Sequence, residues 1–398
     1  VSAVGPYLHD GRADTLDDAI QMHGGEAAQI RDAYRARPKA DREALVEFLM
    51  SLGGREVGTP GLIPPNTPRG AVGEPGGTLT PLTSPEEEAR WQAGRDFFDR
   101  DLFLSDGLGP FFNGDNCRSC HFDPVPGGAG PLDVNAMFFG TLTEDGAFVA
   151  PDAGPGLRKL AVIGRRRPEG HAGDFFETRQ TPTMLGIGLL DQIASEIIVN
   201  GQDVDDMDGD GVRGIANILD DSRVGRFGWK ANVPSLAEFV RDAMSAELGM
   251  TVPDVKGQTF GSKSDDDDVS DPEIDVESLA NLTFYIGQLP APKPKKDVPD
   301  GLKQFERIGC ATCHVPRLRG LPESQPAAYT NLLLHDITKP EQAGIAIGIA
   351  GRTMYRTPPL WGLSDSGPYL HDGHAETIEA AILAHAGEGA GSRTKFSE

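Results

Sequence analysis

The chain has 398 residues, of which 38% are hydrophobic and 24% are charged, and its formal net charge at pH 7 is −23. Its length allows two or three packed domains, and its acidity argues against nucleic acids and anionic membranes as partners. It has no apolar run of about 18 residues that could span a membrane, and it opens without the charged and apolar segments of a secretion signal. The 50 glycines and 31 prolines predict short helices joined by long loops.

The first segment of the chain recurs near its C-terminal end. Residues 5–11, with the sequence Gly-Pro-Tyr-Leu-His-Asp-Gly, are repeated letter for letter as residues 367–373. From Gly5 to Glu26, 14 of 22 positions are identical at a constant offset of 362 residues. The two segments therefore form a true internal repeat.

Each copy of the repeat predicts a short helix with the same end points. The N-cap is a threonine, Thr15 or Thr377, and acidic residues follow it in the first turn. The helix ends at a histidine, His23 or His385, with a glycine just beyond. In the first copy, residues 40–50 continue with the apolar spacing of an amphipathic helix.

A stretch rich in glycine, proline and threonine follows the first copy and shows no periodicity. We therefore interpret residues 1–54 as an N-terminal repeat of the C-terminal segment and residues 55–85 as a linker. A helix then begins at the capping residue Ser84, which a proline and two glutamates follow, and it runs towards Phe98.

Two C-x-x-C-H motifs contain all the cysteines of the chain. The first consists of Cys117, Cys120 and His121, and the second consists of Cys310, Cys313 and His314. This spacing lets two thiols bond covalently to one haem while the adjacent histidine ligates the iron. No cysteine remains for a disulfide or a thiolate zinc site. The motifs thus predict two covalently bound c-type haems, with His121 and His314 as proximal iron ligands.

An acidic segment between the two motifs matches the first half of a calcium-binding loop. Asp206, Asp208 and Asp210 stand at the ligand positions, but Asn217 occupies position twelve, where such loops have a bidentate glutamate. Two interpretations remain, a calcium site formed by the three aspartates and a solvated acidic turn.

A proline- and lysine-rich run divides the rest of the chain. We predict a first haem domain at residues 86–290, a linker at residues 291–300 and a second haem domain at residues 301–398. Thr181-Pro182 is echoed by Thr357-Pro358, as expected of distant duplicates. The predicted fold is mainly α, with two c-type cytochrome domains, short helices, long haem-wrapping loops and few short strands.

Several segments resemble the bacterial di-haem cytochrome c peroxidase superfamily, which also holds the MauG-type enzymes. In the second half these segments are residues 329–336, 356–360 and 367–373. The first half more closely resembles the thiol-oxidoreductase-like di-haem branch, through residues 107–113, 186–190, 206–211 and 225–231. The resemblance covers residues 86–398, and residues 1–50 resemble only the C-terminal segment of the family.

The resemblance implies a distal ligand for the second haem. In the peroxidases, a methionine late in the helix after the Pro-Tyr-x-His-Asp-Gly loop ligates the electron-transfer haem, and His385 occupies that position here. A low-spin bis-histidine centre of fairly low potential is expected. His335 is the alternative ligand, while His371 and His374 are expected to form hydrogen bonds near the haem.

The first haem domain has no histidine at the equivalent position, where Asp191 and Gln192 stand instead. Its iron is therefore expected to be open or water-bound. Breaking a peroxide O–O bond needs such a site with a base nearby, and Asp191 and Gln192 are candidates by position. Trp229 and Lys230 are candidates for an electron path and a catalytic charge, with a buried tryptophan and a surface lysine as the alternative.

Three functions are compatible with these patterns. The first is an extracytoplasmic di-haem oxidoreductase of peroxidase type, in which a low-spin haem passes electrons to a reactive haem. It would take hydrogen peroxide or another oxidisable substrate and draw electrons from a soluble redox protein or small donor. The second is a pure electron-transfer cytochrome, and the third is MauG-like oxidation of a partner protein.

Two further expectations concern the intact polypeptide. Covalent haem is attached outside the cytoplasm, so a targeting segment upstream of Val1 and a periplasmic or otherwise extracytoplasmic location are expected. The copy that bears His23 lacks a C-x-x-C-H motif of its own. Either a further haem domain lies upstream, with His23 as an iron ligand, or the segment is a structural arm.

Overall fold

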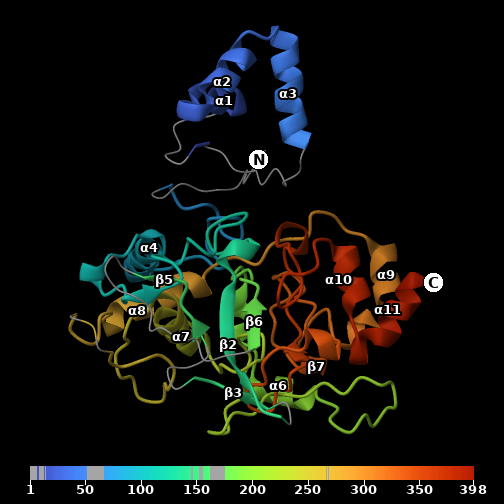
Figure 1. The fold of residues 1–398 in the computed structure, drawn as a ribbon. Helices are drawn as coiled ribbons and strands as arrows, with labels where there is room; N and C mark the ends of the chain where they lie inside the picture. Colours follow the sequence, from blue (N-terminus) through green and yellow to red (C-terminus); the bar gives the residue numbers. More distant parts are fainter. Residues whose placement is uncertain are drawn as a thin grey trace. The chain divides into compact units, whose positions relative to one another are not determined.

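The computed structural model describes residues 7–8, 13, 15–51, 67–144, 147–151, 156–161, 175–265, 267 and 269–398. The chain forms two compact units, Val1–Pro60 and Gly61–Glu398 (Figure 1). The boundary predicted at residue 54 lies outside the described residues. The predicted division of the larger unit at residues 291–300 stays a prediction.

The described part of the smaller unit contains short helices that follow one another in the sequence. They are α1 (Leu16–Met22), the 3₁₀ turn η1 (Gly25–Ala27), α2 (Ala28–Arg35) and α3 (Lys39–Ser51). The hydroxyl of Thr15 accepts a hydrogen bond from the backbone N–H of Asp18 at 3.1 Å, which caps α1 as the sequence predicts. The helix ends at His23, and α3 confirms that residues 40–50 are helical, whereas none of its described side chains is buried.

In the larger unit, a helical core surrounds the first motif. Its helices are α4 (Pro85–Asp99), α5 (Ile187–Asp191), α6 (Ser195–Asn200), α7 (Leu236–Leu248) and α8 (Val276–Gly287). α4 and α8 pack closely because Gly94 has no side chain, and a Cβ there would clash with the carbonyl oxygen of Asn281. The ring of Tyr285 on α8 lies 5.5 Å from that of Trp91 and 5.3 Å from that of Phe98. These aromatic contacts anchor the apolar core.

A small antiparallel sheet lies beside these helices. Its strands are β2 (Ala136–Leu142), β3 (Phe148–Val149), β4 (Gly156–Leu157) and β6 (Phe175–Arg179), while β1 (Phe111–Phe112) pairs with β5 (Leu160–Ala161). β2 is the central strand, and its residues Ala136–Gly140 pair with β6. The described fold therefore mixes helices and strands, whereas the sequence predicts a mainly α fold with few short strands. Apolar residues run continuously through much of β2, which hides its strand alternation in the sequence.

The second motif is held by the C-terminal part of the chain. This part contains α9 (Pro299–Arg307), η4 (Cys310–Thr312), β7 (Leu334–Asp336), β8 (Met354–Arg356), α10 (Ile378–Ala384), η7 (Gly387–Gly389) and α11 (Ala390–Ser397). The remaining 3₁₀ turns are η2 (Leu104–Asp106), η3 (Leu132–Val134), η5 (Pro340–Gln342) and η6 (Leu363–Asp365). Strands β7 and β8 pair so that His335 lies opposite Tyr355. α10 and α11 repeat α1 and α2 at the offset of 362 residues.

A membrane-spanning helix is absent from the described part of the chain, because no helix there combines the required length with the required hydropathy.

Candidate functional site

The first C-x-x-C-H motif forms a single tight turn. The backbone N–H groups of Cys120 and His121 both donate to the carbonyl of Cys117, at 3.3 and 3.1 Å. The Nδ1 atom of His121 lies 3.3 Å from the carbonyl oxygen of Gly128 and must donate, since a carbonyl only accepts. Burial lowers the pKa of His121 to about 4. The imidazole is therefore neutral, with Nε2 left to bind a metal.

The second motif has the same arrangement. The backbone N–H of His314 donates to the carbonyl of Cys310 at 3.0 Å. Its Nδ1 atom donates to the carbonyl of Tyr329 at 2.9 Å. Burial again lowers the pKa of this histidine to about 4. Both motifs thus present two thiols and one neutral, oriented imidazole, the donor set that a c-type haem requires.

A large cavity adjoins the first motif. Its volume is about 800 Å³, and Cys117, Cys120 and His121 are all part of its lining. Cofactor pockets usually measure about 300–1,000 Å³ and are mostly apolar. Apolar side chains from β2 and α7 complete much of this lining, including Phe138 and Phe239. The cavity therefore fits a haem attached to the first motif.

Arginines also line this cavity, and Arg356 is the most informative. It is buried and donates hydrogen bonds to the carbonyls of Gly228 at 3.0 Å and Thr357 at 3.2 Å. Burial lowers its pKa to about 10. In the described part of the chain it forms no ion pair with a carboxylate. A buried cation of this kind suits the carboxylate groups that a haem carries.

Two buried carboxylates of α7, which the sequence reasoning missed, also line the cavity. Burial, followed by repulsion from Glu247, raises the pKa of Asp242 to about 6. Burial raises the pKa of Glu247, whose Oε2 atom accepts a hydrogen bond from Asn113 at 2.7 Å. Asp242 has no hydrogen-bonding partner among the described side chains. The sequence did offer a sign of these two residues, because both acids fall within the amphipathic pattern of residues 236–248. Acidic residues in such a pattern usually lie on the solvent-exposed face of a helix.

The predicted catalytic positions Asp191 and Gln192 lie elsewhere. Both side chains are exposed, and neither is among the described residues that line the cavity. The Oδ1 atom of Asp191 accepts a hydrogen bond from the backbone N–H of Leu236 at 2.9 Å. Asp191 therefore hydrogen-bonds the first turn of α7, and a catalytic role for these two residues stays a prediction that their exposed positions do not favour. Sequence position alone could not show which way the end of α5 faces.

Lys230 is fully buried, which corrects the alternative of a surface lysine. Its Nζ atom donates to the carbonyls of Gly351 at 2.9 Å, Arg352 at 3.2 Å and Met354 at 2.6 Å. Burial lowers its pKa to about 7. Lys230 does not belong to the described lining of the cavity, whereas its neighbour Trp229 does. Its contacts support a structural role, in which it ties the segment around β8 to the first domain.

His385 ends α10 with its ring oriented for metal binding. Its Nδ1 atom donates to the carbonyl of Ala381 at 2.7 Å, which leaves Nε2 available. Burial is the main cause that lowers the pKa of His314; the hydrogen bond to Tyr329 opposes this shift, and the charges of His385 and His335 add to it. Both histidines therefore lie near the second motif. This placement supports the prediction that His385 is the distal ligand.

The alternative ligand, His335, has both ring nitrogens engaged. Nδ1 lies 2.7 Å from the Oε2 atom of Glu388, and Nε2 accepts from the side-chain amide of Asn331 at 2.9 Å. The ring is almost completely buried and lies 3.5 Å from the Sγ atom of Cys313. His335 is therefore better suited to hold the second attachment site than to ligate iron.

His371 and His374 make other contacts than the predicted hydrogen bonds to haem propionates or backbone, so that role stays a prediction. The ring of His371 stacks on that of Tyr355 with 3.8 Å between the centroids, and its carbonyl accepts from the backbone N–H of Gln180 at 2.7 Å. The Nδ1 atom of His374 lies 2.6 Å from the Oδ1 atom of Asp372. These contacts link the C-terminal segment to both domains.

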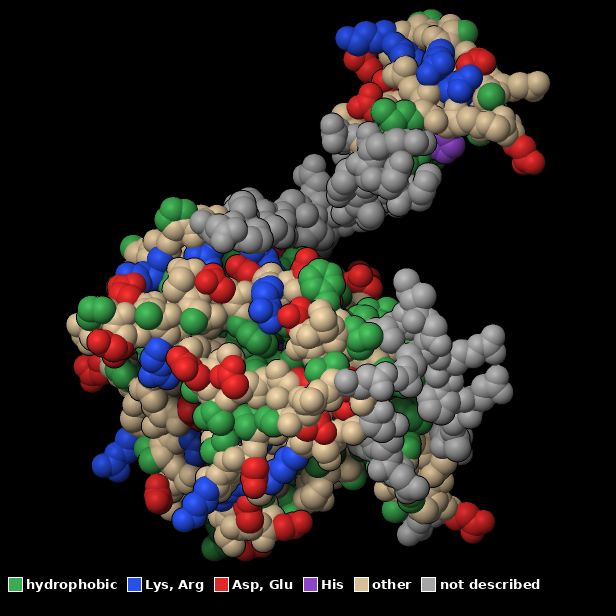
Figure 2. Space-filling view, turned by 90° about the vertical axis from the view of Figure 1, so that its left-hand side faces the viewer, with side chains coloured by type: hydrophobic (Ala, Val, Ile, Leu, Met, Phe, Trp, Pro, Cys, Tyr) green, Lys and Arg blue, Asp and Glu red, His purple; other side chains and the backbone are tan. Residues whose placement is uncertain are grey.

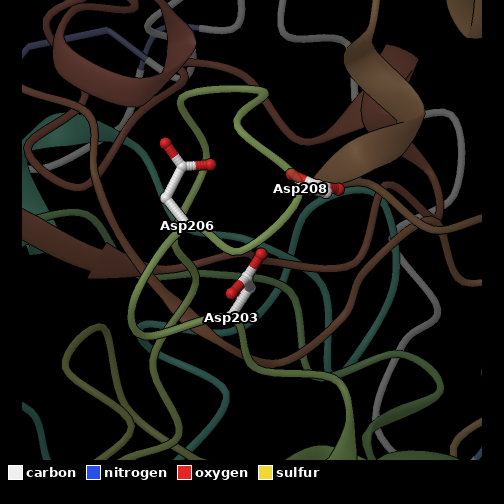
Figure 3. A group of neighbouring side chains, drawn as sticks. All are labelled: Asp203, Asp206 and Asp208. Atoms are coloured by element: carbon white, nitrogen blue, oxygen red, sulfur yellow. The ribbon is translucent and has the colours of Figure 1, made fainter.

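The acidic loop gathers a different trio from the predicted one. Carboxylate oxygens of Asp203, Asp206 and Asp208 lie within 4.8 Å of one another (Figure 3). The predicted third member, Asp210, instead accepts a hydrogen bond from the backbone N–H of Val212 at 2.8 Å. Asp206 has a left-handed backbone (φ 51°), and the turn there brings Asp203 to the other two carboxylates. Calcium binding by this loop stays a prediction.

The two motifs can be tested separately by haem counting. Replacing Cys117 and Cys120 with serine should lower the pyridine haemochrome count from two haems per chain to one, because serine forms no thioether. The matched control replaces Cys310 and Cys313 and should lose the other haem. Two covalent haems in either double variant would contradict attachment at that motif.

Comparisons with known proteins agree with these features. A family model described as "Di-haem oxidoreductase, putative peroxidase" matches residues 1–52 and 174–398, so the second motif lies inside the matched ranges and the first between them. A search of curated proteins found no match. Among solved structures, the chain is similar to a hydrazine synthase of Kuenenia stuttgartiensis that was pressurised with 20 bar xenon. The sequence identity is 15% and the TM-score is 0.39. The alignment covers 84% of this chain and 98% of that chain. A likeness at this level carries no argument about function.

Proposed function

Because the chain belongs to the family of di-haem oxidoreductases, we propose that it is a peroxidase that reduces hydrogen peroxide at the haem of the first motif. His314 and His385 would hold the second haem, which would supply the electrons. The net reaction joins hydrogen peroxide, two protons and two electrons to give two water molecules. A bound haem supplies the iron at which the O–O bond is broken and the electrons are received.

The cavity at the first motif carries this proposal. Apart from His121, no described histidine belongs to its lining, whereas the carboxyl group of Asp242 does. An open coordination position beside a base is what peroxide reduction requires, since a proton must move from one peroxide oxygen to the other. We assign this proton transfer to Asp242, whose pKa of about 6 suits a base at neutral pH.

Other residues that line the cavity affect the pKa of Asp242 and its access to water. Glu247 raises the pKa of Asp242 by charge repulsion and is itself held by Asn113. Apolar side chains of α7, among them Phe239 and Met244, limit the water around the carboxyl group. Burial and then the charge of Glu247 raise the pKa of Cys120, which places Glu247 near the attachment side of the cavity.

The electron donor is a soluble redox protein or a small molecule. Acidic side chains lie among basic ones on the face of the larger unit seen in Figure 2, and the formal net charge of the whole sequence is −23. Such a net charge favours a donor with a basic contact face. We place the protein in the periplasm or another extracytoplasmic space, because c-type haems are attached there.

One observation favours a second candidate, a pure electron carrier. Met137, Met184 and Met244 line the same cavity, and a thioether could occupy the sixth position of the iron. A closed iron of this kind would pass electrons without reacting with peroxide. MauG-like oxidation of a partner protein shares the open iron of the first proposal and differs from it in substrate.

Cyanide titration separates these candidates. The oxidised and the half-reduced protein should bind one cyanide per chain, with loss of a high-spin signal in the electron paramagnetic resonance spectrum. The variant that lacks Cys117 and Cys120 is the control and should bind none. Two low-spin centres and no cyanide binding in either state would favour the carrier.

A further inference from the structure

We propose that His23 and Glu26, on the smaller unit, form a binding site for the iron of a c-type haem that is attached to neither C-x-x-C-H motif of this sequence. His23 provides the iron ligand and Glu26 holds the backbone of the haem-bearing domain. This inference rests on the internal repeat and does not depend on the proposed peroxidase activity.

The two histidines of the repeat have the same local structure. The Nδ1 atom of His23 lies 2.7 Å from the carbonyl oxygen of Ala19, the same distance as in the bond between His385 and Ala381. An arginine eight residues later donates to the histidine carbonyl in both copies, at 2.8 Å from Arg31 and at 3.0 Å in the second copy. In both copies Nε2 is the ring nitrogen left to bind iron.

In the second copy, Glu388 fastens this segment to His335 and Asp336, which lie near the second motif, and to the backbone at Arg213. Its Oε2 atom lies 2.7 Å from Nδ1 of His335 and accepts from the backbone N–H of Arg213 at 3.0 Å. Its Oε1 atom accepts from the backbone N–H of Asp336 at 3.2 Å. The chain approaches so closely that a Cβ at Gly387 would clash with the carbonyl oxygen of Asp336. The carboxylate thus binds groups close to the second motif.

The first copy keeps the residues that make these contacts. Glu26 stands at the position of Glu388, and both it and His23 are exposed. The space beside Gly25 is also open, because a Cβ there would meet no atom within 4 Å. Neighbouring positions differ between the copies, such as Met22, which corresponds to an alanine.

Among the described residues of the smaller unit, the ring of His23 contacts the carbonyl oxygen of Ala19, and no further contact of its Nε2 atom is found. Arg31 donates to the main-chain carbonyl of His23, which a residue of any other type would also provide. Large apolar side chains of the same unit are also exposed, including Met22 at 43%, Ile30 at 74% and Phe48 at 55%. An apolar cofactor and the domain around it would cover such a surface. The partner is therefore a c-type haem domain with an open distal face.

The test adds a short haem peptide with one C-x-x-C-H motif to the full-length protein with both haems in place. Electron paramagnetic resonance and absorption difference spectra follow conversion of the peptide from high spin to low spin. We expect one peptide per chain, bound at least about tenfold more tightly than by N-acetylhistidine amide, because the ring is already oriented. His23→Ala should abolish this binding, whereas the control His374→Ala should retain it.

Two results would overturn the proposal. One is binding that is no tighter than that of the free histidine derivative, or that survives in the His23→Ala variant. The other is loss of a resident low-spin signal in His23→Ala without added peptide, since His23 would then serve a haem of this chain. Peroxide takes no part in this titration, so its outcome is separate from that of the peroxidase proposal.

Discussion

The Asp242→Asn variant should reduce hydrogen peroxide about 100-fold more slowly than the unmodified protein. Asparagine keeps the size of the side chain but cannot accept the proton, and general base catalysis typically contributes about 100- to 10,000-fold. Stopped-flow measurement of peroxide consumption by the half-reduced protein would give this ratio. The haem spectra should remain unchanged, because Asp242 ligates no iron in the proposed site.

The pH dependence gives the same prediction a second readout. The folded-state pKa of Asp242 is raised to about 6, so the carboxylate form becomes dominant only above that pH. The rate should therefore rise between about pH 5 and pH 7 as the proton is lost. Glu247→Gln removes a negative neighbour, lowers the pKa of Asp242 and should move this rise to lower pH. In Asp242→Asn the rise should disappear.

Asp191→Asn is the matched control for this experiment. Asp191 lies on the surface and accepts a hydrogen bond from the first residue of α7. Asparagine keeps the accepting oxygen, so the substitution should leave the rate within about twofold of the unmodified value and the stability little changed. A large loss of rate in Asp191→Asn, or a normal rate in Asp242→Asn, would mean that the base has been assigned to the wrong carboxylate.

The His385→Ala variant should convert the second haem completely from low spin to high spin. His385 is the histidine near the second motif whose Nε2 atom is available, whereas His335 uses both ring nitrogens. Electron paramagnetic resonance of the oxidised protein measures the change directly. The potential of this centre should also rise, since one strong imidazole ligand has been lost.

His374→Ala serves as the control, because the ring of His374 is paired with Asp372 and should not affect the spin state. Survival of the low-spin signal in His385→Ala would identify another ligand and would require a rearrangement at His335. Loss of the signal in both variants would indicate a general disturbance of the C-terminal segment.

Local sequence patterns determined the features that depend on a few neighbouring residues. The C-x-x-C-H spacing identified Cys117, Cys120 and His121, since one turn of backbone holds all three groups. The N-caps at Thr15 and Ser84 were also readable, because the capping hydroxyl lies three residues from the N–H that it accepts from. The internal repeat was evident from sequence identity, and the two copies form the same helices.

The surroundings of the cavity were decided only by the tertiary structure. Asp242 lies more than a hundred residues after Cys117 in the sequence, yet both line one cavity because α7 packs beside the first motif. The burial that raises the pKa of Asp242 comes from the elements around it and leaves no mark in the local sequence. Asp191 shows the converse, since its position was suggestive but, as the last residue of α5, it is exposed to solvent. Sequence spacing determines which groups share a turn, whereas packing over long chain distances determines which groups share a cavity.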